Sequence, residues 1–126
     1  MVLLDTSTLI YWTLAPNQLS TLAAHAIAEA DVLLVNTLSL WELGIKVQRR
    51  KLILPLPVRQ YVQLLKSVRG VRMVANDEEL WLRTLELTWP QRDPVDRALV
   101  ATAQLYDCPL VTPDEAIQRF YAKSIW

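Results

Sequence analysis

The segment Arg92–Ala103 has the sequence RDPVDRALVATA and places two aspartates three residues apart ahead of an apolar, alanine-rich run. Pro94 fits the first position of a helix, where its missing N–H is not needed, so the pattern predicts a helix from here to about Tyr106. Residues three apart on a helix share a face, so Asp93 and Asp96 are expected to point the same way. Two unit charges about 4 Å apart repel by about 4 kcal/mol at an effective dielectric constant near 20. The pair is therefore unfavourable unless water, a proton or a cation lies between the carboxylates.

A structural role also explains these two aspartates. Asp93 is a good N-cap, because its side chain can accept a hydrogen bond from a free main-chain N–H group of the first turn. Asp96, at the third helical position, suits the positive end of the helix dipole. The segment alone therefore leaves a capping role and a charged functional site both open.

The composition limits the chemistry that the chain can carry out. With 126 residues, of which 52% are hydrophobic, the chain is expected to fold as one domain over residues 1–126. Thirteen Lys and Arg balance thirteen Asp and Glu, so no general polyanion-binding surface is predicted, although a local basic patch remains possible. The only cysteine is Cys108 and the only histidine is His25, which excludes a disulfide framework, a Cys/His zinc site and a Ser-His-Asp triad. Only two glycines are present, and no glycine-rich phosphate loop. Any chemistry must use carboxylates, hydroxyls or a hard metal ion.

The N-terminus has no charged region followed by a long apolar one, so we expect no signal peptide. No apolar run reaches the roughly 18 residues of a membrane span. We therefore expect a soluble, cytoplasmic protein.

Short apolar runs alternate with helical patterns along the chain. The runs typical of buried strands are Val2–Leu4, Val32–Val35, Val71–Val74 and Pro109–Val111, and Ser124–Trp126 is the candidate for a last edge strand. Helices are expected from about Leu9, over Ser20–Glu29, from a Ser39–Glu42 capping box, over Val58–Arg69 with Gly70 as C-cap, from Asn76 or Asp77 to about Thr88, from Asp93, and after Thr112–Glu115 up to Phe120. This alternation predicts an α/β fold, a parallel sheet with helices on both faces.

Acidic residues are expected together at one edge of this sheet. Asp5 ends the first strand and has no obvious helix to cap, whereas Glu42 opens the helix after the second strand. Asp93 and Asp96 open the long late helix, and Asp114 follows the fourth strand. In an open parallel sheet, the crevice beyond the carboxyl ends of the strands is the usual ligand site. Each of these acids except Asp5 has a capping explanation of its own, but jointly they would crowd one crevice.

Such a crevice would hold four or five carboxylates with no histidine and no close run of lysines to neutralise them. That donor set suits a hard divalent cation, Mg²⁺ or Mn²⁺, which prefers oxygen ligands. A cation of this kind can activate water and clamp a phosphodiester.

Four segments carry the candidate residues in order: Leu3–Ser7 (LLDTS), Ser39–Leu43 (SLWEL), Arg92–Arg97 (RDPVDR) and Leu110–Glu115 (LVTPDE). They resemble the successive motifs of PIN-domain ribonucleases, especially the VapC-type toxins of toxin–antitoxin pairs. The connector Lys51–Pro57 also resembles the segment after the second motif, so the resemblance covers essentially the whole chain. It implies a single PIN-like domain with a parallel sheet of about five strands, and a metal-dependent endoribonuclease that cuts RNA by water attack on phosphorus. It also implies a homodimer and a small VapB-like antitoxin that blocks the site.

The resemblance assigns roles residue by residue. It implies Asp5, Glu42, Asp96 and Asp114 as catalytic, metal-holding carboxylates, with Asp93 as an accessory ligand or plain cap. In the family, the third acid is usually a single aspartate before an Ile-Ala-Ala-like run, which corresponds here to Val100–Thr102. Both Asp93 and Asp96 are available for this position, and Arg97 lies where some relatives place the acid. We favour Asp96. The small hydroxyl positions that would orient ligands or bound water are Thr6, Ser7 and Thr112.

Basic and aromatic side chains are the candidates for RNA contacts. The residues best placed to bind the phosphate backbone are Lys46, Arg49, Arg50, Lys51, Arg92 and Arg97. Cations at a helix C-terminus also suit its dipole without any ligand. Trp41 and Trp81 have the spacing of helix residues that pack in a core, whereas Tyr11 and Trp12, close to Asp5 in the sequence, are expected nearer the site or a partner groove.

Two other functions fit parts of the sequence. A phosphatase or dehalogenase would use Asp5 as a nucleophile, but Ser7 stands where the phosphatase motif has a second aspartate, and the chain is short for that fold with its cap domain. Alternatively, the acids are only helix caps and the domain is a non-catalytic PIN-like module that binds RNA or a protein.

Overall fold

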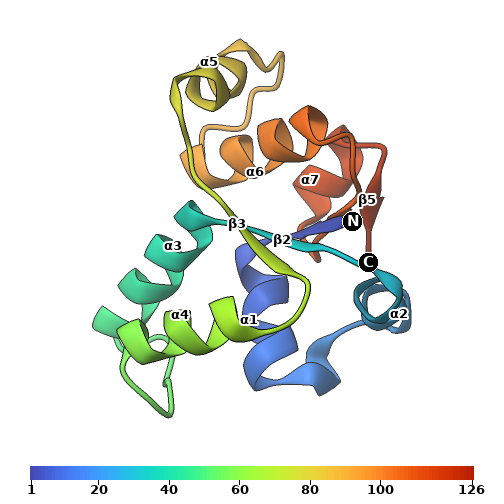
Figure 1. The fold of residues 1–126 in the computed structure, drawn as a ribbon. Helices are drawn as coiled ribbons and strands as arrows, with labels where there is room; N and C mark the ends of the chain where they lie inside the picture. Colours follow the sequence, from blue (N-terminus) through green and yellow to red (C-terminus); the bar gives the residue numbers. More distant parts are fainter.

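The computed structural model describes residues 1–126 and confirms the alternation of strands and helices (Figure 1). The elements in chain order are β1 Val2–Leu4, α1 Thr6–Leu14, a 3₁₀ turn Pro16–Gln18, α2 Thr21–Glu29, β2 Leu33–Asn36, α3 Thr37–Gln48, α4 Val58–Ser67, β3 Val71–Val74, α5 Glu78–Glu86, α6 Pro94–Leu105, β4 Leu110–Val111, α7 Glu115–Phe120 and β5 Ser124–Ile125. None of the helices is long and apolar enough to cross a membrane.

The five strands form one parallel sheet in the order β3-β2-β1-β4-β5. The central strand is β1, in which Leu4 lies opposite Val35 of β2 on one side and Val111 of β4 on the other. From β1 the chain first builds outward through β2 and β3, and it then returns to build β4 and β5 on the other side. This reversal places a crevice beyond the carboxyl end of β1, at the point where α/β proteins bind ligands.

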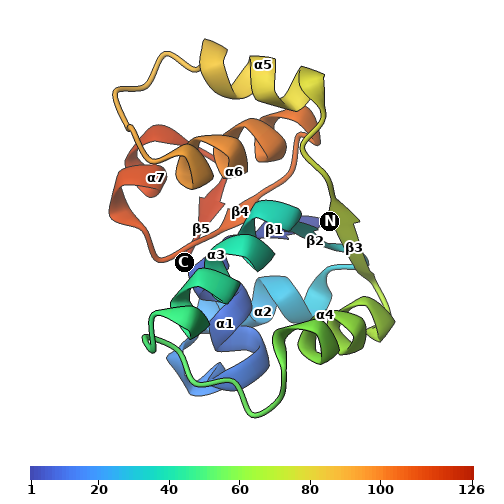
Figure 2. The same ribbon diagram turned by 90° about the vertical axis from the view of Figure 1, so that its left-hand side faces the viewer.

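Helices cover both faces of the sheet, as predicted. Leu3 and Leu34 pack in a core with α5, α6 and α7, whereas Leu4 and Val35 pack in a second core with α1, α2, α3 and α4. Figure 2 shows the first group of helices above the strands and α1, α2 and α4 below them. Successive strand residues face opposite sides, so a fully apolar strand such as Leu33–Val35 serves both cores, and each fully buried leucine contributes about 1.5–3 kcal/mol.

Two helices begin directly at the end of a strand, which the sequence analysis did not predict. Asp5 caps α1 by accepting a hydrogen bond from the Thr8 N–H at 2.7 Å, so the expectation that Asp5 caps nothing is wrong and the helix begins at Thr6. Asn36 caps α3 in the same way, from the Leu38 N–H at 2.8 Å. The capping box predicted at Ser39 is therefore wrong as well. Side-chain oxygens at these two strand ends satisfy the first turns without an intervening loop.

Gly70 also has a different role from the predicted one. Helix α4 ends at Ser67, and Gly70 lies in the turn into β3 with a φ angle of +88°. A Cβ atom there would come within 2.9 Å of the Asp31 carbonyl oxygen. The Gly70 carbonyl in turn accepts a hydrogen bond from the Leu33 N–H at 2.8 Å. Glycine is needed here because the φ angle is positive and the backbone of Asp31, just before β2, passes too close for a side chain.

The Arg97 guanidinium, which the sequence predicts as an RNA contact, is engaged by carbonyls of the protein itself. Its Nη2 donates to the carbonyls of Thr84 and Leu87 at 2.9 and 3.0 Å, and its Nη1 donates to those of Trp89 and Gln91. The last carbonyls of a helix have no partner within the helix, and a guanidinium offers five donors in one plane. Arg97 thereby ties the end of α5 and the following loop to the start of α6.

We expect Arg97→Lys to lower the free energy of unfolding by about 2–3 kcal/mol, because an ammonium group cannot serve these carbonyls from one position. Urea denaturation of wild type and variant measures the difference. Arg92→Lys is the matched control, since Arg92 is exposed and close in sequence. Equal stability of Arg97→Lys and Arg92→Lys would contradict the structural role of Arg97.

Candidate active site

Helices α1, α3, α6 and α7 begin beyond the carboxyl ends of the strands. Five carboxylates belong to the first two turns or the caps of these helices, and we call them the carboxylate cluster. Asp5 caps α1, Asp93 caps α6 and Asp114 caps α7, while Asp96 lies in the first turn of α6 and Glu42 in the second turn of α3. The charges of the other four members each raise the pKa of Asp96. The fold therefore gathers all five predicted acids around Asp96.

Asp5 is buried and held through both of its oxygens. Its Oδ1 accepts from the Thr8 N–H, and its Oδ2 accepts from the Thr112 hydroxyl. Burial raises the pKa of Asp5, the hydrogen bonds from Thr112 and Thr8 oppose this rise, and the charge of Asp114 adds to it. The Thr112 oxygen also accepts from the Asp114 N–H at 3.0 Å. One hydroxyl thus fixes the Asp5 carboxylate relative to the segment that carries Asp114.

Asp96 differs from its neighbour Asp93. The Asp93 carboxylate accepts from the N–H groups of Val95 and Asp96 at 2.8 and 3.1 Å, which makes it an N-cap as expected. The Asp96 side chain has only the Gln91 amide as a partner, at 3.4 Å. Burial, followed by the charge of Asp93 and then those of the other acids, raises the pKa of Asp96 to about 7. Of the two aspartates of α6, Asp96 is therefore the one whose oxygens are more available to a ligand.

The three predicted hydroxyl residues have different surroundings. Only Thr112 contacts an acid of the cluster. The Thr6 hydroxyl donates to the Ser39 hydroxyl at 3.1 Å and so joins the first turns of α1 and α3. Ser7 is half-buried in the first turn of α1.

A buried amide network around Asn36 was not predicted from the sequence. The Asn36 side chain is fully buried and donates to Thr102 at 2.9 Å and to Asn76 at 3.2 Å, while its own oxygen accepts from Asn76 at 2.8 Å. These bonds connect the end of β2, the loop after β3 and the middle of α6. The available signal was the position of Asn36, which follows an apolar strand as Asp5 does.

The donor set fits a hard cation by its chemistry, since it consists of carboxylates and hydroxyls. His25 is exposed on α2, and Cys108 is buried just before β4, at the opposite edge of the sheet. In this conformation no three carboxylate, histidine or cysteine side chains converge closely enough to hold an ion. Carboxylates without a neutralising charge repel one another, and a cation would favour their approach.

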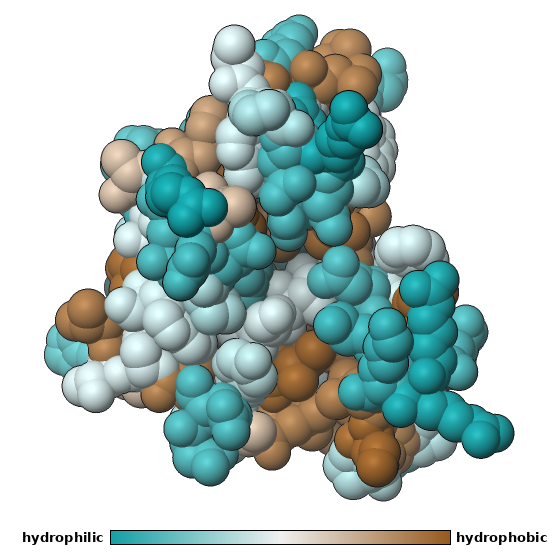
Figure 3. All heavy atoms as spheres, turned by 180° about the vertical axis from the view of Figure 1, so that it is seen from behind, coloured by the Kyte–Doolittle hydropathy of each residue, from teal (hydrophilic) through white to brown (hydrophobic).

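Next to Glu42 lies an open cavity of about 240 Å³, which we call the basic pocket. It is lined by Trp41, Glu42, Ile45, Lys46, Arg49 and Lys51. Hydrophilic side chains gather over this end of α3 and the following loop, at the lower right of Figure 3. Trp41 is 61% exposed and Trp81 is 39% exposed, so the prediction that they pack in the core is wrong. Helix α3 presents Leu43 to the core, which leaves Trp41 on the outer side.

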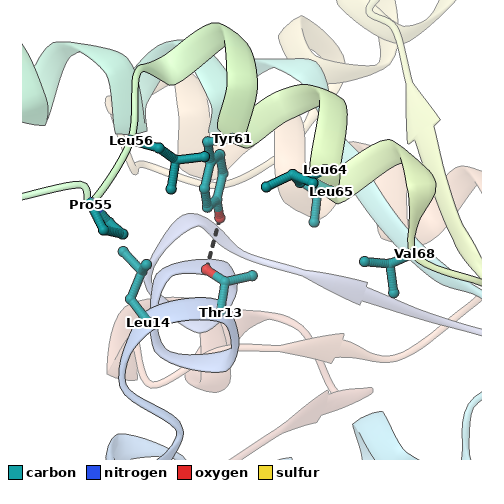
Figure 4. A pocket seen from close by; sticks show the side chains of 8 residues that line it. All are labelled: Thr13, Leu14, Pro55, Leu56, Tyr61, Leu64, Leu65 and Val68. Atoms are coloured by element: carbon teal, nitrogen blue, oxygen red, sulfur yellow. Dashed lines mark hydrogen bonds between the residues drawn. The ribbon is translucent and has the colours of Figure 1, made fainter.

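A second cavity of about 240 Å³ lies between α1 and α4 and is mostly apolar. Figure 4 shows its lining and the hydrogen bond between the Thr13 and Tyr61 hydroxyls, which are 2.8 Å apart. Tyr11 and Trp12 line none of the cavities. Tyr11 packs against Trp126 with ring centroids 6.2 Å apart, and Trp12 packs on the core below the sheet.

Comparison with known proteins gives consistent results. The model of the PIN domain family matches residues 2–123. Ribonuclease VapC22 of Mycobacterium tuberculosis (strain ATCC 25618 / H37Rv) is 33% identical over 118 residues, which cover 93% of this chain and 89% of that protein. A toxin-antitoxin complex from Klebsiella pneumoniae has a chain of the same fold, with a TM-score of 0.73 and 15% identity over 100% of this chain and 97% of that chain. FitAcB from Neisseria gonorrhoeae matches with a TM-score of 0.62 and 15% identity, over 93% of this chain and 90% of that chain.

The raised pKa of Asp96 gives a stability prediction for the metal-free protein in EDTA. Its value of about 7 in the folded state lies above the ordinary value of 3.8, so the folded protein binds more protons than the unfolded one between these limits. The free energy of unfolding therefore falls as the pH rises from about 4 to about 7. Asp96→Asn removes this loss, and we expect the variant to melt above wild type at pH 8 and close to it at pH 4.

Thermal unfolding across this pH range measures the effect. Asp77→Asn is the control, because Asp77 caps α5 outside the cluster and asparagine caps equally well. Parallel pH profiles for wild type and Asp96→Asn would contradict the electrostatic coupling within the cluster.

Proposed function

The chain belongs to the PIN domain family, and from this premise we propose that it is an endoribonuclease toxin of a toxin–antitoxin pair, with the carboxylate cluster as its catalytic centre. One observation carries the assignment of the centre: burial and the charges of four acids, which come from four segments of the chain, together raise the pKa of Asp96 to about 7. Perturbed carboxylates in a crevice are typical of active sites. Membership of the PIN domain family also excludes the phosphatase hypothesis, since enzymes of that class have a different fold.

Asp5, Glu42 and Asp96 would hold a Mg²⁺ or Mn²⁺ ion, with Asp114 as a fourth acid and Asp93 as the cap that positions Asp96. When bound, such an ion supplies activated water and neutralises charge on the phosphate. Asp5 offers a fixed carboxylate, because Thr8 and Thr112 hold it. Asp96 carries a proton for part of the time near neutral pH, and binding of a cation would displace that proton.

The RNA substrate would contact the basic residues on either side of the cluster. Lys46, Arg49, Arg50 and Lys51 follow from α3, and Arg92 precedes α6. None of them forms an ion pair within the protein. Free surface cations near an acidic centre suit a phosphodiester chain whose scissile group is bound by the metal.

We infer a protein antitoxin as the partner, because the solved structures of the same fold include a toxin-antitoxin complex from Klebsiella pneumoniae. The cavity between α1 and α4 offers it an apolar surface, on which Leu64 is 56% and Val68 is 42% exposed. A homodimer is part of the same proposal, and the molar mass of the purified chain in solution tests it.

A non-catalytic binding module is the second candidate. The observation in its favour is that Asp5, Asp93 and Asp114 each accept a main-chain N–H bond as helix caps. Metal binding and cleavage distinguish this function from the enzyme.

We expect Mn²⁺ binding by calorimetry and Mn²⁺-dependent RNA cleavage in wild type, with at least about 100-fold loss of cleavage in Asp5→Asn, Glu42→Gln and Asp96→Asn. The metal-binding heat should also weaken in each variant, because a carboxylate ligand is replaced by a neutral amide. Asp77→Asn controls for the loss of one negative charge outside the cluster. Full cleavage by Asp5→Asn, or no metal binding by wild type, would return the acids to capping roles and favour the binding module.

We expect Thr112→Val to weaken Mn²⁺ binding about 10- to 100-fold, because it frees the Asp5 carboxylate that the hydroxyl holds. Thr112→Ser keeps the hydroxyl and should retain affinity near that of wild type. Calorimetry with both variants, together with their melting curves, separates the hydroxyl from the packing of the side chain. Equal affinities of the Val and Ser variants would contradict this positioning role.

A further inference from the structure

Trp41 carries a large apolar side chain that the rest of the chain leaves mostly exposed. It lies on α3 and is 61% exposed, directly before Glu42 of the carboxylate cluster. The two aromatic pairs of the structure involve other residues. An indole of this size is normally buried or seated against a partner, since burial of an aromatic ring is strongly favourable.

Cationic side chains line the same cavity as this indole. Trp41, Ile45 and Arg49 follow each other at intervals of four, so they lie on one face of α3. The chain then turns back sharply, with the Lys51 N–H bonded to the Lys46 carbonyl at 2.9 Å, and this brings Lys51 to the same cavity. No carboxylate pairs with Lys46, Arg49 or Lys51. An open aromatic face beside unpaired cations matches the combination that binds a nucleobase and its phosphates.

Glu42 belongs both to the carboxylate cluster and to the wall of the basic pocket. The two sites are therefore contiguous along α3, with the acids near its start and the cations near its end. Because Trp41 and Glu42 line the same cavity, an RNA strand whose phosphate lies at the cluster would pass beside the indole.

We propose that Trp41 is a stacking platform for an unpaired base next to the scissile phosphate, while Lys46, Arg49 and Lys51 bind the flanking phosphates. The proposal rests on the ribonuclease function proposed above and specifies its substrate as single-stranded RNA. A base within an A-form duplex has both faces covered by its neighbours, so it cannot lie on the indole unless it leaves the stack. An unpaired base of a single strand can be placed on the indole at little cost in free energy.

The test is binding of a 12-nucleotide single-stranded RNA of mixed sequence, measured in EDTA so that no cleavage occurs. Trp41→Leu should weaken binding about 10-fold, Trp41→Phe should restore most of it, and Trp81→Leu should match wild type. The same RNA annealed to its complement should bind wild type and Trp41→Leu alike. Trp41 is exposed, so these variants should keep the wild-type melting temperature.

Salt dependence separates stacking from charge. Trp41→Leu should leave the slope of log Kd against log salt concentration unchanged, whereas Lys46→Gln should lower it by about 0.7, the contribution of one phosphate contact to a single strand. Removal of the base from the nucleotide beside the mapped cleavage position should weaken RNA binding by wild type about 10-fold. It should not weaken RNA binding by Trp41→Leu any further.

Wild-type affinity of Trp41→Leu for the single strand would overturn the proposal, as would equal weakening of single-strand and duplex binding. Mn²⁺ calorimetry on Trp41→Leu keeps this result separate from the function proposed above. Unchanged metal binding with weaker RNA binding supports the platform, whereas loss of metal binding would show that the substitution had damaged the cluster instead. Absence of metal binding in wild type would count against the ribonuclease function. The RNA-binding measurements on Trp41→Leu would then still decide whether Trp41 is a stacking platform.

Discussion

The buried Asp5 carboxylate is the constraint on which the rest of the site depends. A charged group removed from water costs several kcal/mol unless its oxygens are bonded, and here both are, by the Thr8 N–H and the Thr112 hydroxyl. Thr112 can reach Asp5 only because β1 and β4 pair with Leu4 opposite Val111. The register of the sheet therefore determines whether Thr112 can hold the Asp5 carboxylate, since a shift of the strand by one residue would turn Thr112 to the other face.

The same arrangement concentrates negative charge on acids that form no ion pair with any Lys or Arg of the protein. The guanidinium nearest in sequence to Asp96, that of Arg97, is bound to main-chain carbonyls instead. The pKa of Asp96 rises as a result, since burial and four neighbouring carboxylates all oppose its charge. Stability comes from the two apolar cores, which leaves the crevice free to carry an unfavourable charge distribution suited to a cation.

The features predictable from the sequence were those that depend on local pattern. Apolar runs and helical spacing indicated the parallel sheet, and the positions of the acids, after strands or at helix starts, indicated that they lie at one edge of it. Roles that depend on distant partners were not predictable. Arg97 bonds carbonyls up to 13 residues away, and no local pattern distinguishes such a residue from one that contacts a substrate. Trp41 was misassigned because spacing identifies an apolar face but does not fix which way it points. Asn36 and Asp5 cap helices that start directly after a strand, whereas a loop between strand and helix was expected.

The end of α3 suggests that its cations serve more than the helix dipole. The dipole alone would be satisfied by Lys46 in the last turn. Arg50 follows with a φ angle of 58°, in the left-handed conformation that ordinarily calls for glycine at this position of a helix end. An arginine there costs the fold about 1 kcal/mol or more, and no ion pair with a carboxylate compensates for it. The Arg50 N–H donates to the Val47 carbonyl at 3.1 Å and the Lys51 N–H to the Lys46 carbonyl at 2.9 Å, so this conformation belongs to the cap of the helix end. The feature that favours a bound polyanion is therefore the row of cations without ion pairs that begins beside Glu42.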